Sequence, residues 1–118
     1  MRFEDLVVWK RSVSLSAEIY KHFSSCRDYG FKDQITRSGL SIPSNIAEGF
    51  ERESTRECLK FLSYAKGSCA ELRTQIYIGL EIAYIKKETA DRWLNETIEI
   101  SSMIRGLMKT KKRFLEES

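Results

Sequence analysis

The stretch Ser54–Ile85, STRECLKFLSYAKGSCAELRTQIYIGLEIAYI, decides the fold of this 118-residue chain. It opens with a capping box, in which Ser54 can accept a bond from the third backbone amide and Glu57 can reach back. Apolar or small residues then recur alternately every four and three positions: Cys58, Leu62, Ala65, Cys69, Leu72, Ile76, Gly79 and Ala83. This spacing predicts one long amphipathic helix that runs to about Ile85, with its apolar seam in a core.

The same periodicity predicts three further helices. The first is expected over residues 3–24, the second over residues 32–51, and the fourth from near Thr89, as its N-cap, into a basic tail. The loops at 24–30, 51–54 and 86–88 are short, and short loops force neighbouring helices to run antiparallel. The sequence therefore predicts an all-α, up-down-up-down four-helix bundle that forms a single domain over residues 1–118.

Pro43 lies inside the second predicted helix, where it removes one backbone hydrogen bond and crowds the carbonyl four residues back. The helix could kink at Pro43, or it could stop there and a new helix could start with Ser44 as its cap. The apolar seam keeps its phase through the proline, which favours one kinked helix; its members are Ile35, Gly39, Ile42, Ile46 and Gly49.

Composition and the N-terminus limit the class of protein. The chain is 42% hydrophobic and 31% charged, which is ordinary for a globular domain. No apolar run approaches the roughly 20 residues of a membrane span, and residues 1–5 contain no apolar core of a secretory signal. The three cysteines lack C-x-x-C spacing, so neither a disulfide framework nor a zinc site is expected. We expect a protein of the reducing cytoplasm that does not enter membranes.

Residues that could carry catalysis are scarce. His22 is the only histidine, and we expect it at the surface near a helix end. Cys58 and Cys69 fall on the apolar seam and read as small buried hydrophobes rather than nucleophiles. The six glycines are dispersed and form no phosphate-binding loop. The sequence therefore predicts no catalytic, metal-binding or cofactor-binding residues, and no enzyme.

Two rows of polar residues follow the second and third predicted helices. The first row is Gln34, Arg37, Ser41, Asn45 and Glu48, and the second is Ser68, Glu71 and Gln75. They could be solvated faces, a hydrogen-bonded network within the bundle or between subunits, or, least in keeping with their chemistry, a catalytic site. Buried polar groups are costly unless they are paired, so a buried network would fix the register of the helices.

Basic residues cluster near the C-terminus although the net charge is only +3. Cations at a helix C-terminus can simply complement the helix dipole, or they can contact phosphates. The candidate phosphate contacts are Lys10, Arg11, Arg105, Lys109, Lys111, Lys112 and Arg113. The tyrosines at positions 20, 29, 77 and 84 form no recognisable base-stacking motif.

The stretch 34–49, QITRSGLSIPSNIAEG, resembles a known family. It is similar to the four-helix bundle proteins encoded in intervening sequences of bacterial large-subunit ribosomal RNA genes, the S23 family. Further similarities are Phe3, Leu6 and Trp9 at the start, and residues 61–72 in the third predicted helix. The resemblance covers nearly the whole chain. It departs at residues 26–28, where the family usually has Phe-Pro before the second helix.

The resemblance implies a four-helix bundle with a continuous, proline-containing second helix, and a ring-shaped homopentamer. It also implies kinship with accessory proteins of diversity-generating retroelements, which bind nucleic acid and a reverse transcriptase. No catalytic residue carries over. The matching motif residues could serve the fold or a subunit interface; they are Gln34, Arg37, Ser41, Pro43, Asn45, Glu48, Gly49 and Glu71.

Two functions therefore stay open. The first is an oligomer that associates with RNA or DNA through its basic residues. The second is a scaffold or accessory subunit that binds another protein without touching nucleic acid, which the interleaved acids and bases at 48–57 fit equally well. Oligomerisation is also expected from the third predicted helix, because Tyr77, Leu80 and Tyr84 fall off its apolar seam and would leave an exposed patch on a monomer.

Overall fold

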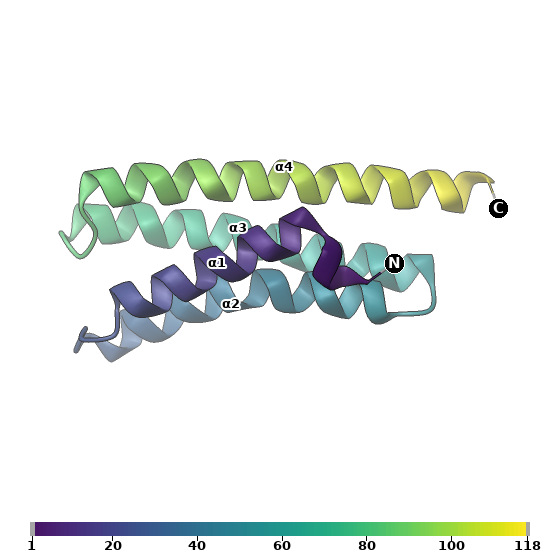
Figure 1. The fold of residues 1–118 in the computed structure, drawn as a ribbon. Coiled ribbons are helices and arrows are strands. Elements are labelled where there is room, and N and C mark those ends of the chain that lie inside the picture. Colours follow the sequence, from purple (N-terminus) through teal and green to yellow (C-terminus); the bar gives the residue numbers. More distant parts are fainter. Residues whose placement is uncertain (1, 118) are drawn as a thin grey trace.

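The computed structural model describes residues 2–117, which form helices and no strand (Figure 1). A 3-10 helix, η1 (Phe3–Asp5), precedes α1 (Val7–His22), α2 (Tyr29–Glu51), α3 (Thr55–Glu81) and α4 (Lys87–Glu117). Successive α-helices run in opposite directions within an envelope of 50 × 21 × 20 Å. The all-α four-helix bundle predicted from the sequence is confirmed.

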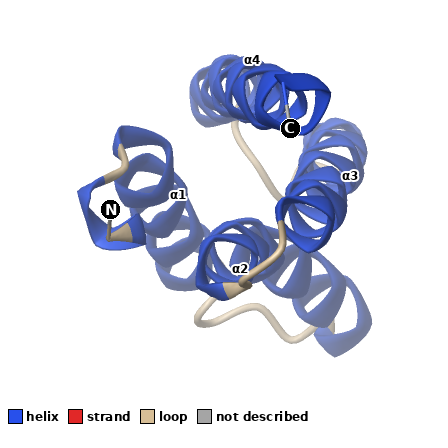
Figure 2. Ribbon diagram, turned by 90° about the vertical axis from the view of Figure 1, so that its right-hand side faces the viewer, coloured by secondary structure: helices blue, strands red, loops and turns tan. Residues whose placement is uncertain are grey.

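Each helix packs against two neighbours. α3 lies between α2 and α4 and makes the most extensive contacts with both. α1 packs on α2 and meets α4 along a narrower seam. The end-on view shows the four helices around one centre, with α1 and α3 on opposite sides (Figure 2). The α1–α4 seam is therefore the least packed side of the bundle.

The predicted apolar seam of α3 forms the centre of the core. Leu62, Ala65, Leu72 and Ile76 are each 0% exposed, and the two cysteines of the seam are also buried. At the start of α3, the Ser54 hydroxyl accepts a hydrogen bond from the Glu57 amide at 3.0 Å, as the capping box predicts. The predicted phase and start of this helix are therefore correct.

The end of α3 differs from the prediction, because the helix stops at Glu81 and not near Ile85. Ala83 has a φ of 65°, in the left-handed region. The Tyr84 amide donates to the Gly79 carbonyl at 2.8 Å, and the Ala83 amide donates to the Leu80 carbonyl at 3.1 Å. These two bonds form a Schellman motif, which usually places glycine where Ala83 stands.

The turn after α3 returns Ile85 to the core, where it is 2% exposed. A Cβ atom on Gly79 would lie 2.5 Å from the Ile85 Cδ1 atom, so the glycine leaves the space that Ile85 fills. Ile85 therefore belongs to the core, as its apolar character suggests, although it lies outside the helix.

Two other boundaries also differ from the prediction. α1 begins at Val7, because Leu6 is extended with ψ 126° and separates it from the 3-10 turn of residues 3–5. α2 begins at Tyr29, within the predicted loop, because the Asp28 carboxylate accepts a hydrogen bond from a backbone amide of the first turn at 3.2 Å. Asp28 is thus an N-cap, although the sequence pattern places it in a loop.

α4 begins at Lys87, so Thr89 is not its N-cap. Lys87 forms an ion pair with Asp91 at 2.9 Å, one turn further along the same helix. Lys87 therefore belongs to the first turn of α4.

Helical structure continues through Pro43, which is buried in α2. Ile42 and Ile46 on either side of it are 0% exposed, so the apolar seam runs on without a break. The interpretation that a new helix starts at Ser44 is wrong, and a continuous second helix is confirmed. The kink at Pro43 stays a prediction.

Replacing Ala83 with glycine is expected to raise the free energy of unfolding by roughly 0.5 kcal/mol. A left-handed conformation costs an L-residue about 1–2 kcal/mol, and glycine removes this cost from the folded state. The greater freedom of glycine in the unfolded chain offsets about 0.4–1 kcal/mol of the stability gained in this way. Chemical denaturation of the purified protein measures the change.

The matched control for this prediction is Ala70→Gly, at an exposed position inside α3. This variant should lose about 0.5–1 kcal/mol of stability, as glycine does inside helices. Equal losses at positions 70 and 83 would show that the left-handed turn exerts no strain.

Candidate nucleic-acid interface

The basic tail is helical through its whole length. Arg105, Lys109, Lys112 and Arg113 are exposed on α4, and no hydrogen bond or ion pair within residues 2–116 holds their side chains. Lys111 differs, because its ammonium group lies 5.0 Å from the centre of the Phe50 ring. Lys111 therefore makes a cation–π contact with a ring near the end of α2 and contributes less to the free cationic surface.

A groove between α3 and α4 adds two cations that the sequence pattern did not indicate. Lys66 and Arg73 of α3 line it together with Arg105 of α4. Ser101, Ser102 and Ile98 complete the lining of a cavity of about 260 Å³. No carboxylate is among these lining residues. Three cations thus converge on a groove whose lining does not neutralise them.

Further cations follow the groove toward the C-terminus of α4, because Lys109 and Lys112 share the helix face of Arg105. Lys66 and Arg73 are seven residues apart on one face of α3, and Arg105 and Lys112 are seven apart on α4. Each pair spans about 10 Å along its own helix. Because α3 and α4 are antiparallel, the two rows extend in opposite directions along the bundle. We call this surface the basic track; it consists of Lys66, Arg73, Arg105, Lys109 and Lys112.

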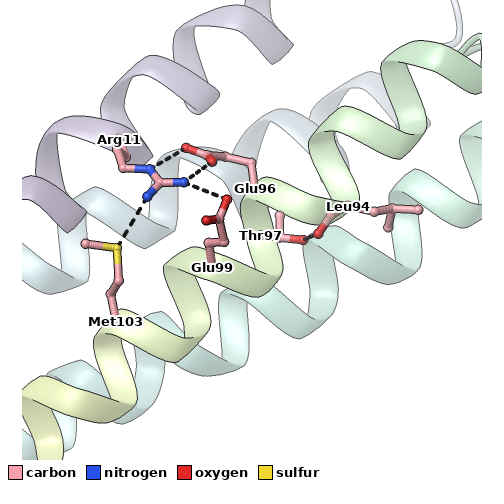
Figure 3. Close-up of polar contacts among 6 residues, drawn as sticks. All are labelled: Arg11, Leu94, Glu96, Thr97, Glu99 and Met103. Atoms are coloured by element: carbon pink, nitrogen blue, oxygen red, sulfur yellow. Dashed lines mark hydrogen bonds and ion pairs between the residues drawn. The ribbon is translucent and has the colours of Figure 1, made fainter.

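Arg11 does not belong to this surface. Its guanidinium binds the Glu96 carboxylate through Nε, at 2.9 Å, and through Nη2, and it also binds Glu99 at 2.9 Å (Figure 3). The pKa of Arg11 is raised, chiefly by the hydrogen bond to Glu96. The Met103 sulfur, on α4 like the two glutamates, lies 3.8 Å from the Nη1 atom of Arg11. Two carboxylates therefore already neutralise the charge of Arg11. The neighbouring Lys10 is exposed, but it lies on α1, which does not pack against α3, so it does not belong to the basic track either.

A second ion pair joins α1 and α4 further along their seam. Glu18 accepts a hydrogen bond from the Trp93 indole at 2.6 Å and pairs with Arg92. The Trp93 hydrogen bond, together with Arg92, lowers the pKa of Glu18. A cavity of about 500 Å³ on this side is lined by both acids and bases, among them the five ion-pairing residues of the seam. α4 therefore has a neutralised side toward α1 and an unneutralised cationic side toward α3.

Known proteins resemble this chain over most of its length. A family model described as 23S rRNA-intervening sequence protein matches residues 4–106. The chain belongs to this family. It is also similar to the crystal structure of a protein with unknown function from the S23 ribosomal protein family of Bacteroides thetaiotaomicron. That likeness has a TM-score of 0.81 and 25% identity, and it covers 87% of this chain and 99% of the other. No curated protein matches the chain.

The family match includes part of the basic track. Lys66, Arg73 and Arg105 lie inside the matched residues, whereas Lys109 and Lys112 lie beyond them. The groove is thus built on the framework of the 23S rRNA-intervening sequence proteins, and the tail extends it. The resemblance drawn from residues 34–49 is confirmed at the level of the family.

The polar rows of α2 and α3 meet inside the bundle at one point. The Ser41 and Ser68 hydroxyls lie 2.7 Å apart, and the Asn45 amide donates to the Ser41 hydroxyl at 2.9 Å and carbonyl at 2.8 Å. A hydrogen-bonded network between the two helices is therefore present, which was one of the open interpretations. The oxygen of Gln75, further along α3, is buried without a partner among the described residues.

The remaining motif residues face solvent or serve packing. Gln34 and Glu71 are exposed, Arg37 pairs with Asp33, and Glu48 pairs with Arg52, each pair within α2 or at its end. A Cβ atom on Gly49 would lie 3.2 Å from the Cys58 carbonyl oxygen and 3.3 Å from the Phe61 Cβ atom. Gly49 therefore permits the close approach of α2 and α3, and Pro43 is buried in the same helix.

The cysteines and the histidine lie outside this network. Cys58 and Cys69 are free and buried, and burial raises the pKa of Cys69 to about 12. His22 is exposed and its ring is hydrogen-bonded to the Tyr84 carbonyl at 3.0 Å. The described residues contain no group of His, Cys, Asp and Glu side chains that could hold a metal ion. No helix among them is both long and apolar enough to cross a bilayer.

Replacing Glu18 with glutamine tests the polar seam. At neutral pH the variant should lose up to about 1 kcal/mol of stability, because the pair with Arg92 is partly exposed. The pKa of Glu18 is lowered in the folded protein, so its contribution is present above the unfolded pKa and is lost as pH falls through the folded value. The difference between the parent and Glu18→Gln should therefore shrink toward zero in acid.

Urea denaturation at neutral and at acidic pH measures this difference. Glu53→Gln is the control, because Glu53 is exposed in the loop before α3 and no ion pair within the described residues holds it. A loss at position 18 that is the same at both pH values would contradict the assigned role of its charge.

Proposed function

We propose that the protein is a non-enzymatic, oligomeric helical bundle that associates with RNA through the basic track. The observation that carries this proposal is the groove in which Lys66, Arg73 and Arg105 converge without a carboxylate. Phosphate contacts need clustered cations and no particular base sequence. The description of the family, which refers to intervening sequences of 23S rRNA, points to the same class of partner.

The contrast between the two sides of α4 supports this role for the track. On the α1 side, carboxylates hold Arg11 at 2.9 Å and Arg92 at 2.5 Å, and both cations contribute to the fold. On the α3 side, each cation of the track projects without an ion pair within the described residues. Unpaired cations on one surface repel one another, and a polyanion that binds there relieves the repulsion.

Oligomerisation, five copies by family resemblance, is supported by two apolar surfaces that lie away from the track. Val13, Tyr20 and Leu40 on α1 and α2 are 37%, 46% and 48% exposed. On the outer side of α3, Tyr64 and Ile78 are 51% and 46% exposed. Two different surfaces on one chain suit the heterologous contacts of a closed ring.

The patch expected on the third helix is smaller than predicted. Tyr77 and Tyr84 are 59% and 38% exposed. Leu80 is half-buried instead, because it packs against the core. The support for self-association therefore comes from the two surfaces named above and not from residues 77, 80 and 84 together.

The RNA-binding prediction concerns Lys66→Gln, Arg73→Gln and Arg105→Gln combined in one variant. It should bind RNA more weakly than the parent, and the slope of log affinity against log salt should fall by about 0.7 to 0.9 for each phosphate that is no longer neutralised. Fluorescence anisotropy of a labelled RNA at several salt concentrations measures both quantities. A second variant, Lys109→Gln with Lys112→Gln and Arg113→Gln, should act in the same direction.

The control combines Lys21→Gln, Arg27→Gln and Lys86→Gln, which removes three exposed charges at the loop end of the bundle, away from the track. It should keep most of the affinity. The proposal would be contradicted if the parent bound no RNA, or if the variant with Lys66, Arg73 and Arg105 replaced bound RNA as tightly as the parent. The scaffold function, with a protein partner such as a reverse transcriptase, would then take its place.

The oligomer prediction is a particle mass in solution of about five times 13.8 kDa. Tyr64→Glu should lower that mass without lowering the helical content, because the side chain is exposed and charge would disfavour an apolar contact. Ser63→Glu, at the adjacent exposed position, is the control. Light scattering that reports a 13.8 kDa monomer for the parent at micromolar concentration would contradict this prediction.

A further inference from the structure

Tyr77 has an exposed aromatic ring that nothing in the fold uses. It is 59% exposed, and within the described residues no ring packs on it and no group hydrogen-bonds its hydroxyl. Two other tyrosines are engaged: the Tyr64 ring packs edge-on against Phe61 at 5.6 Å, and Tyr84 binds Asp28 through its hydroxyl at 2.8 Å. Tyr20 and Tyr29 are also exposed, but they lie on α1 and α2, which do not form the groove. The Tyr77 ring is therefore open to a planar ligand.

The position of Tyr77 ties this ring to the basic track. Tyr77 follows Arg73 by four residues and Lys66 by eleven on α3, so the three share one face of the helix. One turn of helix separates Tyr77 from Arg73, about 6 Å along the axis. Ile98 lines the groove beside Arg73 and is 50% exposed, which extends the apolar surface at this end.

The unpaired cations of the basic track end next to Tyr77. Glu81 is exposed one turn further along α3, and Asp91 near the start of α4 is already paired with Lys87 at 2.9 Å. A phosphate chain that follows the cations from Lys112 to Arg73 meets no further cation of the basic track beyond that point. The strand therefore has favourable phosphate contacts up to this point and an unoccupied aromatic ring at the end of them.

We propose that Tyr77 is a stacking platform for an unpaired base, so that the track binds single-stranded RNA in preference to duplex. This inference rests on the proposed function and names its substrate class. Stacking needs a base whose face is free, which a duplex does not offer within its stack. Base–aromatic stacking is indifferent to sequence, so the site selects strandedness and not a base sequence.

The test compares a short unstructured RNA with the same strand annealed to its complement, by anisotropy at one salt concentration. The parent should favour the single strand. Tyr77→Ala should weaken single-strand binding roughly 5- to 100-fold, the range that removal of one base–aromatic stack produces, and should leave duplex binding and the salt slope unchanged. Tyr77→Phe should retain the parent's affinity, because the ring is what stacks.

Tyr29→Ala is the matched control, since Tyr29 is 70% exposed and lies at the start of α2, away from the track. Its affinity should equal that of the parent. A single-stranded DNA of the same sequence should show the same weakening with Tyr77→Ala, because the ring does not need a ribose hydroxyl.

A direct readout is ultraviolet cross-linking of an RNA that carries iodouracil, with the modified peptide identified by mass spectrometry. The peptide with Tyr77 should be labelled in the parent. Equal affinity of Tyr77→Ala and parent for the single strand would overturn the stacking site while leaving the phosphate-binding proposal intact. A parent that binds neither strand nor duplex would overturn both.

Discussion

The burial of one apolar stripe on α3 fixes the orientation of the other surfaces of this protein. Leu62, Ala65, Leu72 and Ile76 are fully buried, so rotation of α3 about its axis would expose part of the core at about 25 cal/mol per Å². Once that phase is set, the flank toward α4 must carry Lys66, Arg73 and Tyr77. The flank toward α2 carries Ser68 and Gln75, and the outer side carries Tyr64 and Ile78. The candidate site is thus a by-product of how the core packs.

The two seams of α4 differ in whether their charged side chains are paired within the fold. The α1–α4 seam is the least packed, and it is held by polar contacts: Arg11 with two glutamates, and Glu18 with Arg92 and Trp93. Partly exposed ion pairs stabilise weakly, so this seam depends on several of them acting together. The α3–α4 seam is well packed by apolar residues and needs no ion pair across its surface. Its cations are therefore free to meet an anion.

Sequence periodicity predicted the helices and the core well, and it failed where local geometry decides. The end of α3 was misplaced because Ala83, and not a glycine, occupies the left-handed position of the turn. The start of α2 was misplaced because Asp28 stands in a stretch that reads as a loop. Arg11 was grouped with the basic tail because the sequence shows its positive charge. It does not show that α4 supplies two glutamates that pair with it. Lys66 and Arg73 were missed because Arg105 lies more than 30 positions away in the sequence. The three residues become neighbours only when α3 packs against α4.

The geometry of the track also bears on why such a protein would assemble. One chain offers a short row of unpaired cations over about 20 Å, and phosphate contacts of this kind weaken steeply as salt rises. For the RNA binding proposed above, a single track would therefore be a weak binder at physiological ionic strength. The apolar surfaces suited to self-association lie on α1, α2 and the outer side of α3, so copies can join there without covering the groove between α3 and α4. Repetition of the track around the proposed ring would make each further contact with the same strand intramolecular, which would raise the overall affinity without any new side chain. In such an assembly an unpaired base at each Tyr77 would mark the interval at which the strand passes from one copy to the next.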